Sequence, residues 1–360
     1  MKFNNNNEDH TMSEETDLHE SIAHTIRTYR HGELATPTPE HVARWASQFT
    51  VPDRLNFLRE FDHVIKQTFI TEEGVKTFLG NLVKSEKFAG AAPATYWAGA
   101  NFLTIQRAGQ SQKAMVNLFA ETLAQHCGLE LKNCGSQGGD YIYLDDVLFT
   151  GGRVATDLIA WIEGSAPPKA IVHVIVMALH TSGLYYLSHT KLPQAIAKTG
   201  KDIKVRFWRS FELENQRNHR DTSQVLWPAA VPDDEAVQAY VASETRFPLV
   251  LRNPGGTRGV FSSEEGRQLL EREFLIAGVK IRSLTQAPKD FIRPLGCSGF
   301  GVGFGSTIAT YRNCPNNSPL ALWWGDPNVN EGALHWYPLL SRKTYAAPEN
   351  VFNEFVKFKV

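Results

Sequence analysis

Apolar residues recur at helical spacing through the first quarter of the chain. In TPEHVARWASQF, the residues Val42, Trp45, Ala46 and Phe49 stand at i, i+3, i+4 and i+7, which places them on one face of a helix. DRLNFLREFDHVIKQTF and TEEGVKTFLGNLVKSEKF repeat this pattern. We therefore expect a helical N-terminal module over residues 17–90. The residues before it, which begin MKFNNNNEDH, are polar and rich in Asn, and this composition predicts a disordered tail over residues 1–16.

Beyond Pro93 the pattern changes to short apolar runs that alternate with helical periodicity. The runs predict strands, and the sequences between several of them predict helices. Such alternation favours an α/β fold with a mainly parallel sheet over residues 91–215. The predicted strands are NFLTIQ (101–106), LELKNC (129–134), YIYLDDVL (141–148), AIVHVIVMAL (170–179) and IKVRFW (203–208).

Residues 216–360 have a less regular pattern, with many Pro, Gly and Asn residues, and we expect an irregular C-terminal extension. SSEEGRQLLEREFLIAG predicts one helix in it, with a capping box at Ser262 and Glu265. GFGVGFGS (299–306) alternates Gly with apolar residues, which predicts a strand with close backbone approach.

Composition limits the classes of function. The chain has 360 residues, 42% hydrophobic and 21% charged, with a formal net charge of −1. This balance is typical of a globular protein and gives no overall attraction to nucleic acid or anionic membrane. The four cysteines form no Cys-x-x-Cys pair, which argues against a zinc ribbon. Because the chain has neither a long apolar run nor an apolar signal core, we expect a cytoplasmic protein without membrane partners.

The most informative stretch is YIYLDDVLFTGGR, residues 141–153. A strand, a Gly-rich turn and a helix together form an anion site, because loop amides and the first turn of the helix point their N–H groups at one place. Asp145 and Asp146 stand at the carboxyl end of the strand, where open α/β sheets bind ligands. Acids would repel a phosphate, so sugar hydroxyls and a divalent cation are their natural partners. A ribose 5′-phosphate satisfies both parts of the pattern.

This stretch resembles the signature of type I phosphoribosyltransferases. The resemblance implies a Rossmann-like core, over about residues 91–215, that binds phosphoribosyl pyrophosphate with Mg²⁺. It implies that Asp145 and Asp146 serve catalysis and hold the metal. It also implies a phosphate-binding loop made of Phe149, Thr150, Gly151, Gly152 and Arg153.

Two positions depart from the family pattern. Some members carry an acid that acts as a base where Phe149 stands, and the family usually has Thr or Ser where Arg153 stands. Phe149 offers no base, while Arg153 replaces a hydroxyl donor with a guanidinium. These departures argue against ordinary base exchange and leave sugar-phosphate binding in place.

The family also has a pyrophosphate loop after its first core strand. RAGQS falls at that place, between NFLTIQ and a predicted helix. The alternative is an ordinary strand-to-helix turn. The residues that the resemblance assigns to this loop are Arg107, Ala108, Gly109, Gln110 and Ser111.

Four further residues are candidates for a nucleobase or cleft contact. His180 and Thr181 follow the most apolar strand, and either they line the same cleft or Thr181 or Ser182 caps a helix. Trp323 and Trp324 fall in the region where family members form a hood over the base, so the resemblance suggests stacking. Burial in a core is the competing and preferred interpretation of these tryptophans.

The whole plan resembles the branch of phosphoribosyltransferase-like proteins from bacterial conflict systems. The resemblance rests on the helical N-terminal module, the DDVLFTGG core and the tail from LALWWGDP to LHWYPLLSRK. It implies an effector of anti-phage defence, within a retron or similar operon. The implied partners are a defence-system protein, or a reverse transcriptase with its nucleic acid.

Three functions stay open from the sequence. The first is an enzyme that binds phosphoribosyl pyrophosphate or a nucleotide with Mg²⁺ and transfers the phosphoribosyl group. The second is a module that senses such a ligand without turnover, which the missing loop base favours. The third is a hydrolase that removes the base from nucleotides or RNA.

Overall fold

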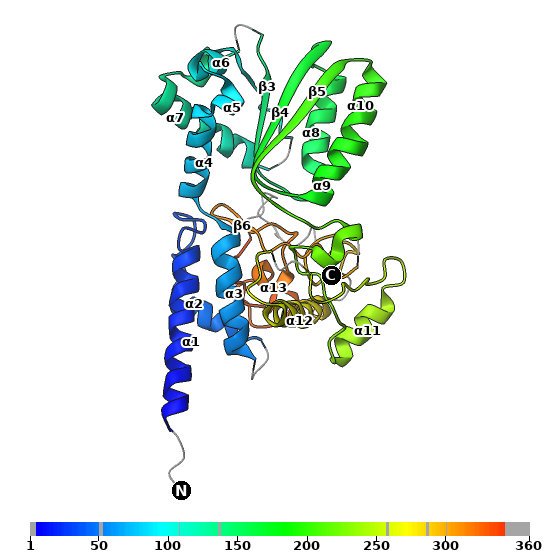
Figure 1. Ribbon diagram of the computed structural model, residues 1–360. Helices are drawn as coiled ribbons and strands as arrows, with labels where there is room; N and C mark the ends of the chain where they lie inside the picture. Colours follow the sequence, from blue (N-terminus) through cyan, green and yellow to red (C-terminus); the bar gives the residue numbers. More distant parts are fainter. Residues whose placement is uncertain are drawn as a thin grey trace. The chain divides into compact units, whose positions relative to one another are not determined.

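The computed structural model describes residues 5–49, 53–107, 109–135, 138–256, 259–285, 288–299 and 301–342. The chain divides into two units: unit 1 joins Met1–Thr71 to Asn218–Val360, and unit 2 is Glu72–Arg217 (Figure 1). This division differs from the boundaries expected from the sequence. The helices between residues 72 and 90 belong with the sheet, and the two terminal regions, expected as separate parts, form one unit.

Unit 1 is mainly helical. Its first helix, α1, begins at Asn5, so residues 5–16 are helical, and the expected disordered tail is wrong for this segment. Glu14 of α1 pairs with Arg59 of α3 at 2.5 Å, which gives this polar segment a partner. The elements of unit 1 are α1 (Asn5–Ile26), α2 (Pro39–Ala46), α3 (Arg54–Thr68), β1 (Phe69–Ile70), α11 (Glu235–Ser243), α12 (Glu264–Ser283), β6 (Ala309–Thr310), α13 (Leu320–Trp323) and the 3₁₀ helix η4 (Gly332–Leu334), while the 3₁₀ helix η3 (Arg217–Thr222) begins at the unit boundary.

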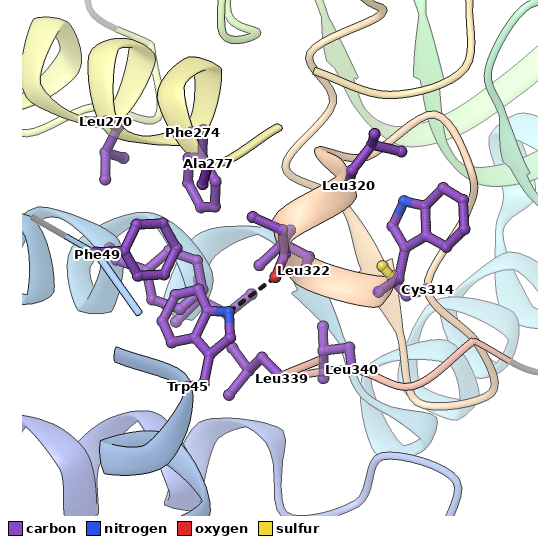
Figure 2. Close-up of a cluster of buried hydrophobic side chains, with 14 of the residues drawn as sticks. Trp45, Phe49, Leu270, Phe274, Ala277, Cys314, Leu320, Leu322, Leu339 and Leu340 are labelled. Carbon is purple, nitrogen blue, oxygen red and sulfur yellow. Dashed lines mark hydrogen bonds between the residues drawn. The ribbon is translucent and has the colours of Figure 1, made fainter. Parts of the chain in front are cut away.

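The core of unit 1 is built on the apolar face predicted for α2. The Thr38 side chain caps α2, and Val42, Trp45 and Ala46 are fully buried, as their spacing predicts. Trp45 packs among Phe49 and Phe274, and its indole N–H donates to the Ala321 carbonyl at 2.8 Å (Figure 2). The two ends of the chain therefore share one hydrophobic core.

Two details of the C-terminal region differ from expectation. The cap of α12 is Ser263, which accepts the Gly266 N–H at 2.9 Å, because the Ser262 hydroxyl donates to Glu60 of α3 instead. The described part of 299–306 is not a strand. The close approach expected there is present, since a Cβ on Gly305 would lie 2.2 Å from the Leu226 carbonyl oxygen.

Unit 2 is an α/β domain, as the alternating pattern predicts. Its four strands are all parallel, in the order β2-β3-β4-β5. Figure 1 shows α8 and α10 on one side of this sheet and α4 to α7 on the other. The elements are α4 (Glu72–Lys84), α5 (Glu86–Ala89), α6 (Pro93–Gly99), β2 (Asn101–Phe102), α7 (Ser111–Cys127), the 3₁₀ helix η1 (Leu131–Asn133), β3 (Tyr141–Leu148), α8 (Gly152–Glu163), β4 (Lys169–His180), α9 (Thr181–Tyr186), the π-helix η2 (Leu187–Lys191), α10 (Leu192–Thr199) and β5 (Asp202–Leu213).

Two predicted strands of unit 2 are wrong. The first ends at Phe102 instead of residue 106, because the side-chain oxygen of Gln112 takes the amide N–H groups of Ile105 and Gln106. Within 129–134, residues 131–133 form the 3₁₀ helix η1, and none of the six is buried, so their alternating pattern has no core to face. Among the described residues, no helix has the length and apolar character needed to cross a lipid bilayer.

Candidate functional site

The candidate site lies within unit 2, at the edge of the sheet where the parallel strands end. Phe149 follows β3 directly, His180 ends β4, and Glu214 follows β5. Asp145 pairs with Val176 in the sheet register, so its backbone is held against β4. The carboxyl edge of such a sheet is the usual ligand side, and Asp145 and Asp146 lie in the carboxyl-terminal half of β3, three and two residues before its end.

Asp145 is a buried carboxyl group, with 3% of its surface exposed. Its Oδ1 accepts the Asp146 amide N–H at 2.9 Å, and the Ser111 side chain lies near enough to lower its pKa. Burial, followed by the charge of Asp146, raises the pKa of Asp145 to about 7, against the opposing effects of Ser111 and Arg153. A buried acid of this kind needs a proton or a cation at its oxygens near neutral pH.

The loop from Phe149 to Arg153 turns sharply into α8. Gly151 has φ +74°, in the left-handed region that favours glycine, and stands directly before the helix. A Cβ on Gly151 would lie 2.8 Å from the Gly183 carbonyl oxygen. Thr150 Oγ1 accepts the Gly152 N–H at 3.4 Å. The turn therefore needs glycine for both its conformation and its contact with α9.

Gly183 in α9 packs closely against the same loop, and we expect Gly183→Ala to displace the loop. Its Cβ would lie 2.0 Å from the Phe149 carbonyl oxygen, which is backbone and yields little. Alanine gains about 1 kcal/mol of helix propensity over glycine, but overpacking of this kind costs about 1–3 kcal/mol or more. Urea unfolding should show a net loss of stability. Gly152→Ala is the control, since its Cβ would meet only Thr150 Oγ1 at 3.5 Å, and equal stability of the two variants would contradict the argument.

The second predicted loop lies beside the first. Arg107 donates its amide N–H to Asp157 of α8 at 3.2 Å, and a Cβ on Gly109 would lie 3.5 Å from Arg153 Nη1. Ser111 begins α7 and accepts the Gln106 side-chain amide at 2.9 Å. Gln110 is the residue before α7, and Ala108 lies outside the described residues. Both candidate anion loops thus meet at the same edge, next to Asp145.

Three residues of this arrangement were missed by sequence reasoning. Asp157 is buried, holds the Arg107 backbone and accepts the Tyr143 hydroxyl at 3.0 Å. Burial, Asp145 and Asp157 raise the pKa of Tyr143, so the phenol stays protonated and donates. Gln112 ties residues 105 and 106 to the start of α7. Asp157 had a readable signal, because it is a polar residue on the apolar face of α8 between Val154 and Trp161.

His180 is buried and Thr181 is half-buried, and both make hydrogen bonds within unit 2. His180 is fully buried, bonds through Nδ1 to the Leu148 carbonyl oxygen at 3.2 Å, and stacks on Phe149 with ring centres 5.0 Å apart. The Thr181 hydroxyl donates to Glu214 at 2.6 Å and does not cap α9. These contacts tie the end of β4 to the chain segments that follow β3 and β5.

Burial of His180 predicts a pH dependence of stability. Burial lowers its pKa to about 4, below the usual 6.5, so between these values the unfolded chain binds a proton that the folded chain does not. Stability of unit 2 should therefore fall as the pH drops through this window, by about 1.4 kcal/mol per pH unit for this group. Urea unfolding across pH 4–7 should show a flatter slope in His180→Asn. The exposed His189→Asn is the control, and an unchanged slope in both variants would contradict the assignment.

Trp323 and Trp324 belong to the core of unit 1, as the preferred interpretation has it. Each is 1% exposed, and their indole N–H groups donate to the carbonyl oxygens of Ser318 and Ala333, both at 2.8 Å. Covered rings with paired N–H groups offer no face to a nucleobase. The suggestion that they stack on a base is therefore wrong for this structure.

Comparison with known proteins identifies a family. A family model described as PRTase-CE matches residues 42–342, which include the unit 2 site and most of unit 1. Neither the curated proteins nor the solved structures contain a match.

Proposed function

We propose that this chain, which belongs to the PRTase-CE family of phosphoribosyltransferase-like conflict-system proteins, binds phosphoribosyl pyrophosphate or a nucleotide with Mg²⁺ at the carboxyl edge of the unit 2 sheet. Family membership makes it a defence-related phosphoribosyltransferase-like protein. The observation that supports the ligand is that two loops meet beside the acid pair: Ser111 and Arg153 both lower the pKa of Asp145, and Gly109 lies against Arg153.

The roles follow from the chemistry of each part. Thr150, Gly151 and Gly152 form the turn at the start of α8, where amide N–H groups and the helix dipole attract a phosphate. Arg153 adds a guanidinium, which binds phosphate oxygens well. Residues 107–111 would hold a second phosphate group, and Asp145 with Asp146 would face the ribose hydroxyls and the metal.

The acid pair fits Mg²⁺. Magnesium is usually held by one or two carboxylates together with ligand phosphates and waters. Asp145 and Asp146 supply two such groups, and the described part of the chain contains no cluster of three or more His, Cys, Asp or Glu suited to a metal. The metal would therefore arrive with the ligand and offset the charge of the buried acid. When bound, it would neutralise phosphate charge.

Titration calorimetry with phosphoribosyl pyrophosphate and with AMP, each with Mg²⁺ and with a chelator, tests this proposal. We expect Mg²⁺-dependent binding of at least one ligand, and a stability gain of about 2.7 kcal/mol at a hundredfold excess over Kd. Absence of binding by both ligands would overturn it.

The same incubation separates turnover from sensing. Release of pyrophosphate, ribose phosphate or free base identifies an enzyme, while stabilisation without product identifies a ligand sensor. One observation favours the sensor. Phe149 occupies the position of the loop base, and it stacks on His180, which is itself covered.

The proposal extends to partners and location only through the family. A defence-system protein, or a reverse transcriptase with its nucleic acid, would read the state of the site in the cytoplasm. Affinity purification from cells with and without phage, followed by mass spectrometry and nucleic-acid sequencing, tests that part. Recovery of the chain alone under both conditions would contradict it.

A further inference from the structure

A groove continues from the candidate phosphate loop along α8. It encloses about 770 Å³ and is lined by Arg107, Gly152, Thr156, Ala160, Tyr186 and Lys191, among others. Gly152, Thr156 and Ala160 recur every fourth residue, so they follow one face of α8 for about 12 Å. The groove therefore begins at the loop and leads away from Asp145 and Asp146, along the helix.

The opposite wall comes from α9 and η2. Tyr186 ends α9 with 39% of its surface exposed, and Lys191 Nζ lies 5.3 Å from the centre of its ring. The segment Leu187–Lys191 is a π-helix, and Pro193 follows it inside the continuous helical run. Proline cannot donate to the helix ladder and clashes with the carbonyl four residues earlier, which accounts for the widened turn. Such turns are frequent at functional sites.

The charges and surfaces of the groove select its occupant. Arg107 and Lys191 supply cations, and the Glu163 carboxylate at the far end pairs with Lys198 at 2.8 Å. An exposed aromatic ring beside a cation suits a nucleobase joined to a phosphate, because bases stack on Tyr and phosphates pair with Lys. The volume is in the range of small-molecule sites.

We propose that this groove binds a second nucleotide, attached to the far side of the phosphate that the loop holds. This inference rests on the proposed function and narrows its ligand class. The preferred ligand is a nucleotide whose 5′-phosphate is joined to a second nucleotide or nucleoside. A terminal 5′-monophosphate has no group to place in the groove. Two sources share this chemistry, a pyrophosphate-linked dinucleotide and the phosphodiester of an oligonucleotide.

Binding of three probes tests the inference: AMP, NAD⁺ and the phosphodiester ApA, each titrated with Mg²⁺. We expect NAD⁺ or ApA to bind about tenfold or more tightly than AMP, the effect of one stacked base. The tighter of the two identifies the source. Tyr186→Ala and Lys191→Ala should each remove most of this advantage and leave AMP binding unchanged. Ala160→Phe, which fills the groove two turns beyond the loop, should do the same.

Matched controls separate the groove from general surface effects. Tyr185→Ala removes a neighbouring exposed tyrosine, and Lys204→Ala removes an exposed lysine of β5; neither residue is among those that line the groove. Both control variants should still bind NAD⁺ or ApA more tightly than AMP, by the same factor as the unchanged chain. Equal affinity for AMP and both esters, or an advantage that survives Tyr186→Ala and Ala160→Phe, would overturn the inference and leave the proposed function standing. If AMP, both esters and phosphoribosyl pyrophosphate all fail to bind, the proposed function falls together with the inference.

Discussion

Replacement of both acids of β3, Asp145→Asn with Asp146→Asn, is expected to abolish Mg²⁺-dependent ligand binding and any turnover while the fold survives. The loss should reach roughly a hundredfold or more in affinity, since removal of one partner of a buried charged contact costs about 2–5 kcal/mol. Calorimetry on the purified variant measures it. Full activity or full affinity in this variant would contradict the proposed function.

The stability of the double variant, in contrast to its ligand affinity, should not fall. Asp145 is buried beside a second carboxylate, and both burial and that charge raise its pKa. An amide of the same shape keeps an oxygen for the Asp146 N–H and carries no charge, so thermal unfolding of the double variant should occur at the same or a higher temperature. A marked loss of stability would instead identify the pair as structural.

Asp140 provides the matched control. It stands just before β3, at the opposite edge of the sheet, and accepts a hydrogen bond from His173 at 2.9 Å. The Trp208 indole donates to the other ring nitrogen of His173, which fixes the proton on the nitrogen that faces Asp140. Asp140→Asn should therefore affect stability without weakening the ligand, the reverse of the acid-pair result.

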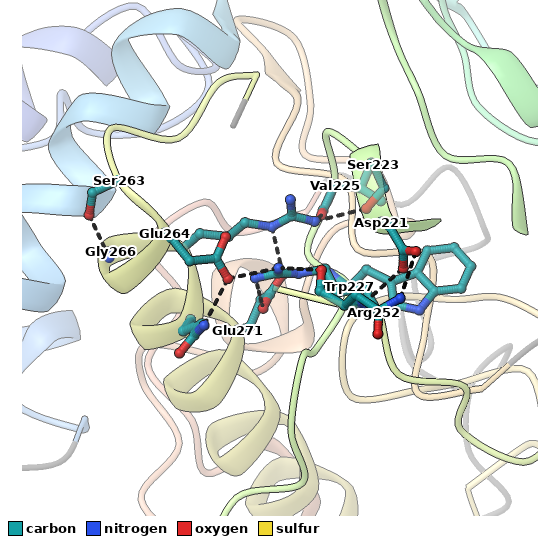
Figure 3. Close-up of polar contacts among 12 residues, drawn as sticks. Asp221, Ser223, Val225, Trp227, Arg252, Ser263, Glu264, Gly266 and Glu271 are labelled. Atoms are coloured by element: carbon teal, nitrogen blue, oxygen red, sulfur yellow. Dashed lines mark hydrogen bonds and ion pairs between the residues drawn. The ribbon is translucent and has the colours of Figure 1, made fainter. Parts of the chain in front are cut away.

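The second large effect is expected in unit 1, where Glu271→Ala should cost about 3–5 kcal/mol of unfolding free energy. Glu271 is buried and binds Arg252 through two hydrogen bonds, at 3.0 and 2.9 Å, and Arg267 through one at 2.9 Å (Figure 3). Both guanidinium groups are fully covered. Alanine at this position leaves two buried cations without their shared acid.

Denaturant unfolding of unit 1 measures this loss. Glu14→Ala is the control, because Glu14 pairs with Arg59 at 2.5 Å on the surface of the same unit, where such pairs add little to stability. Glu271→Gln should fall between the two, since it keeps an acceptor and loses the charge. A Glu271→Ala variant as stable as Glu14→Ala would show that the arginines find other partners.

The sequence predicts the parallel sheet of unit 2 better than the division into units. The limits of β3 are correct because its residues other than Asp145 and Asp146 are apolar or aromatic and turn residues bound the strand on both sides. β2 is shorter than predicted because a side chain from α7, seven residues away from Ile105, takes the backbone donor that a ladder would use. Strand propensity and periodicity do not predict that a side chain will take a backbone donor in this way.

Longer-range contacts explain the other differences. Ser262 and Ser263 both suit a helix cap, and the choice is made by Glu60, two hundred residues earlier in the chain. Unit 1 depends on contacts of the same range, such as the bond from Trp45 to Ala321. Local sequence patterns do not specify these long-range contacts.

Because unit 1 is built from both ends of the chain, the order of synthesis determines when it can fold. Strand β1 pairs with β6 through Phe69 and Ala309, so unit 1 is completed only after the whole of unit 2 has been translated. Domains generally fold as they emerge from the ribosome. Unit 2 is complete at Arg217, while the apolar faces of α2 and α3 still lack their C-terminal partners. A chain released before its C-terminal part is made would thus contain a complete unit 2, while the apolar faces of α2 and α3 would lack their C-terminal partners.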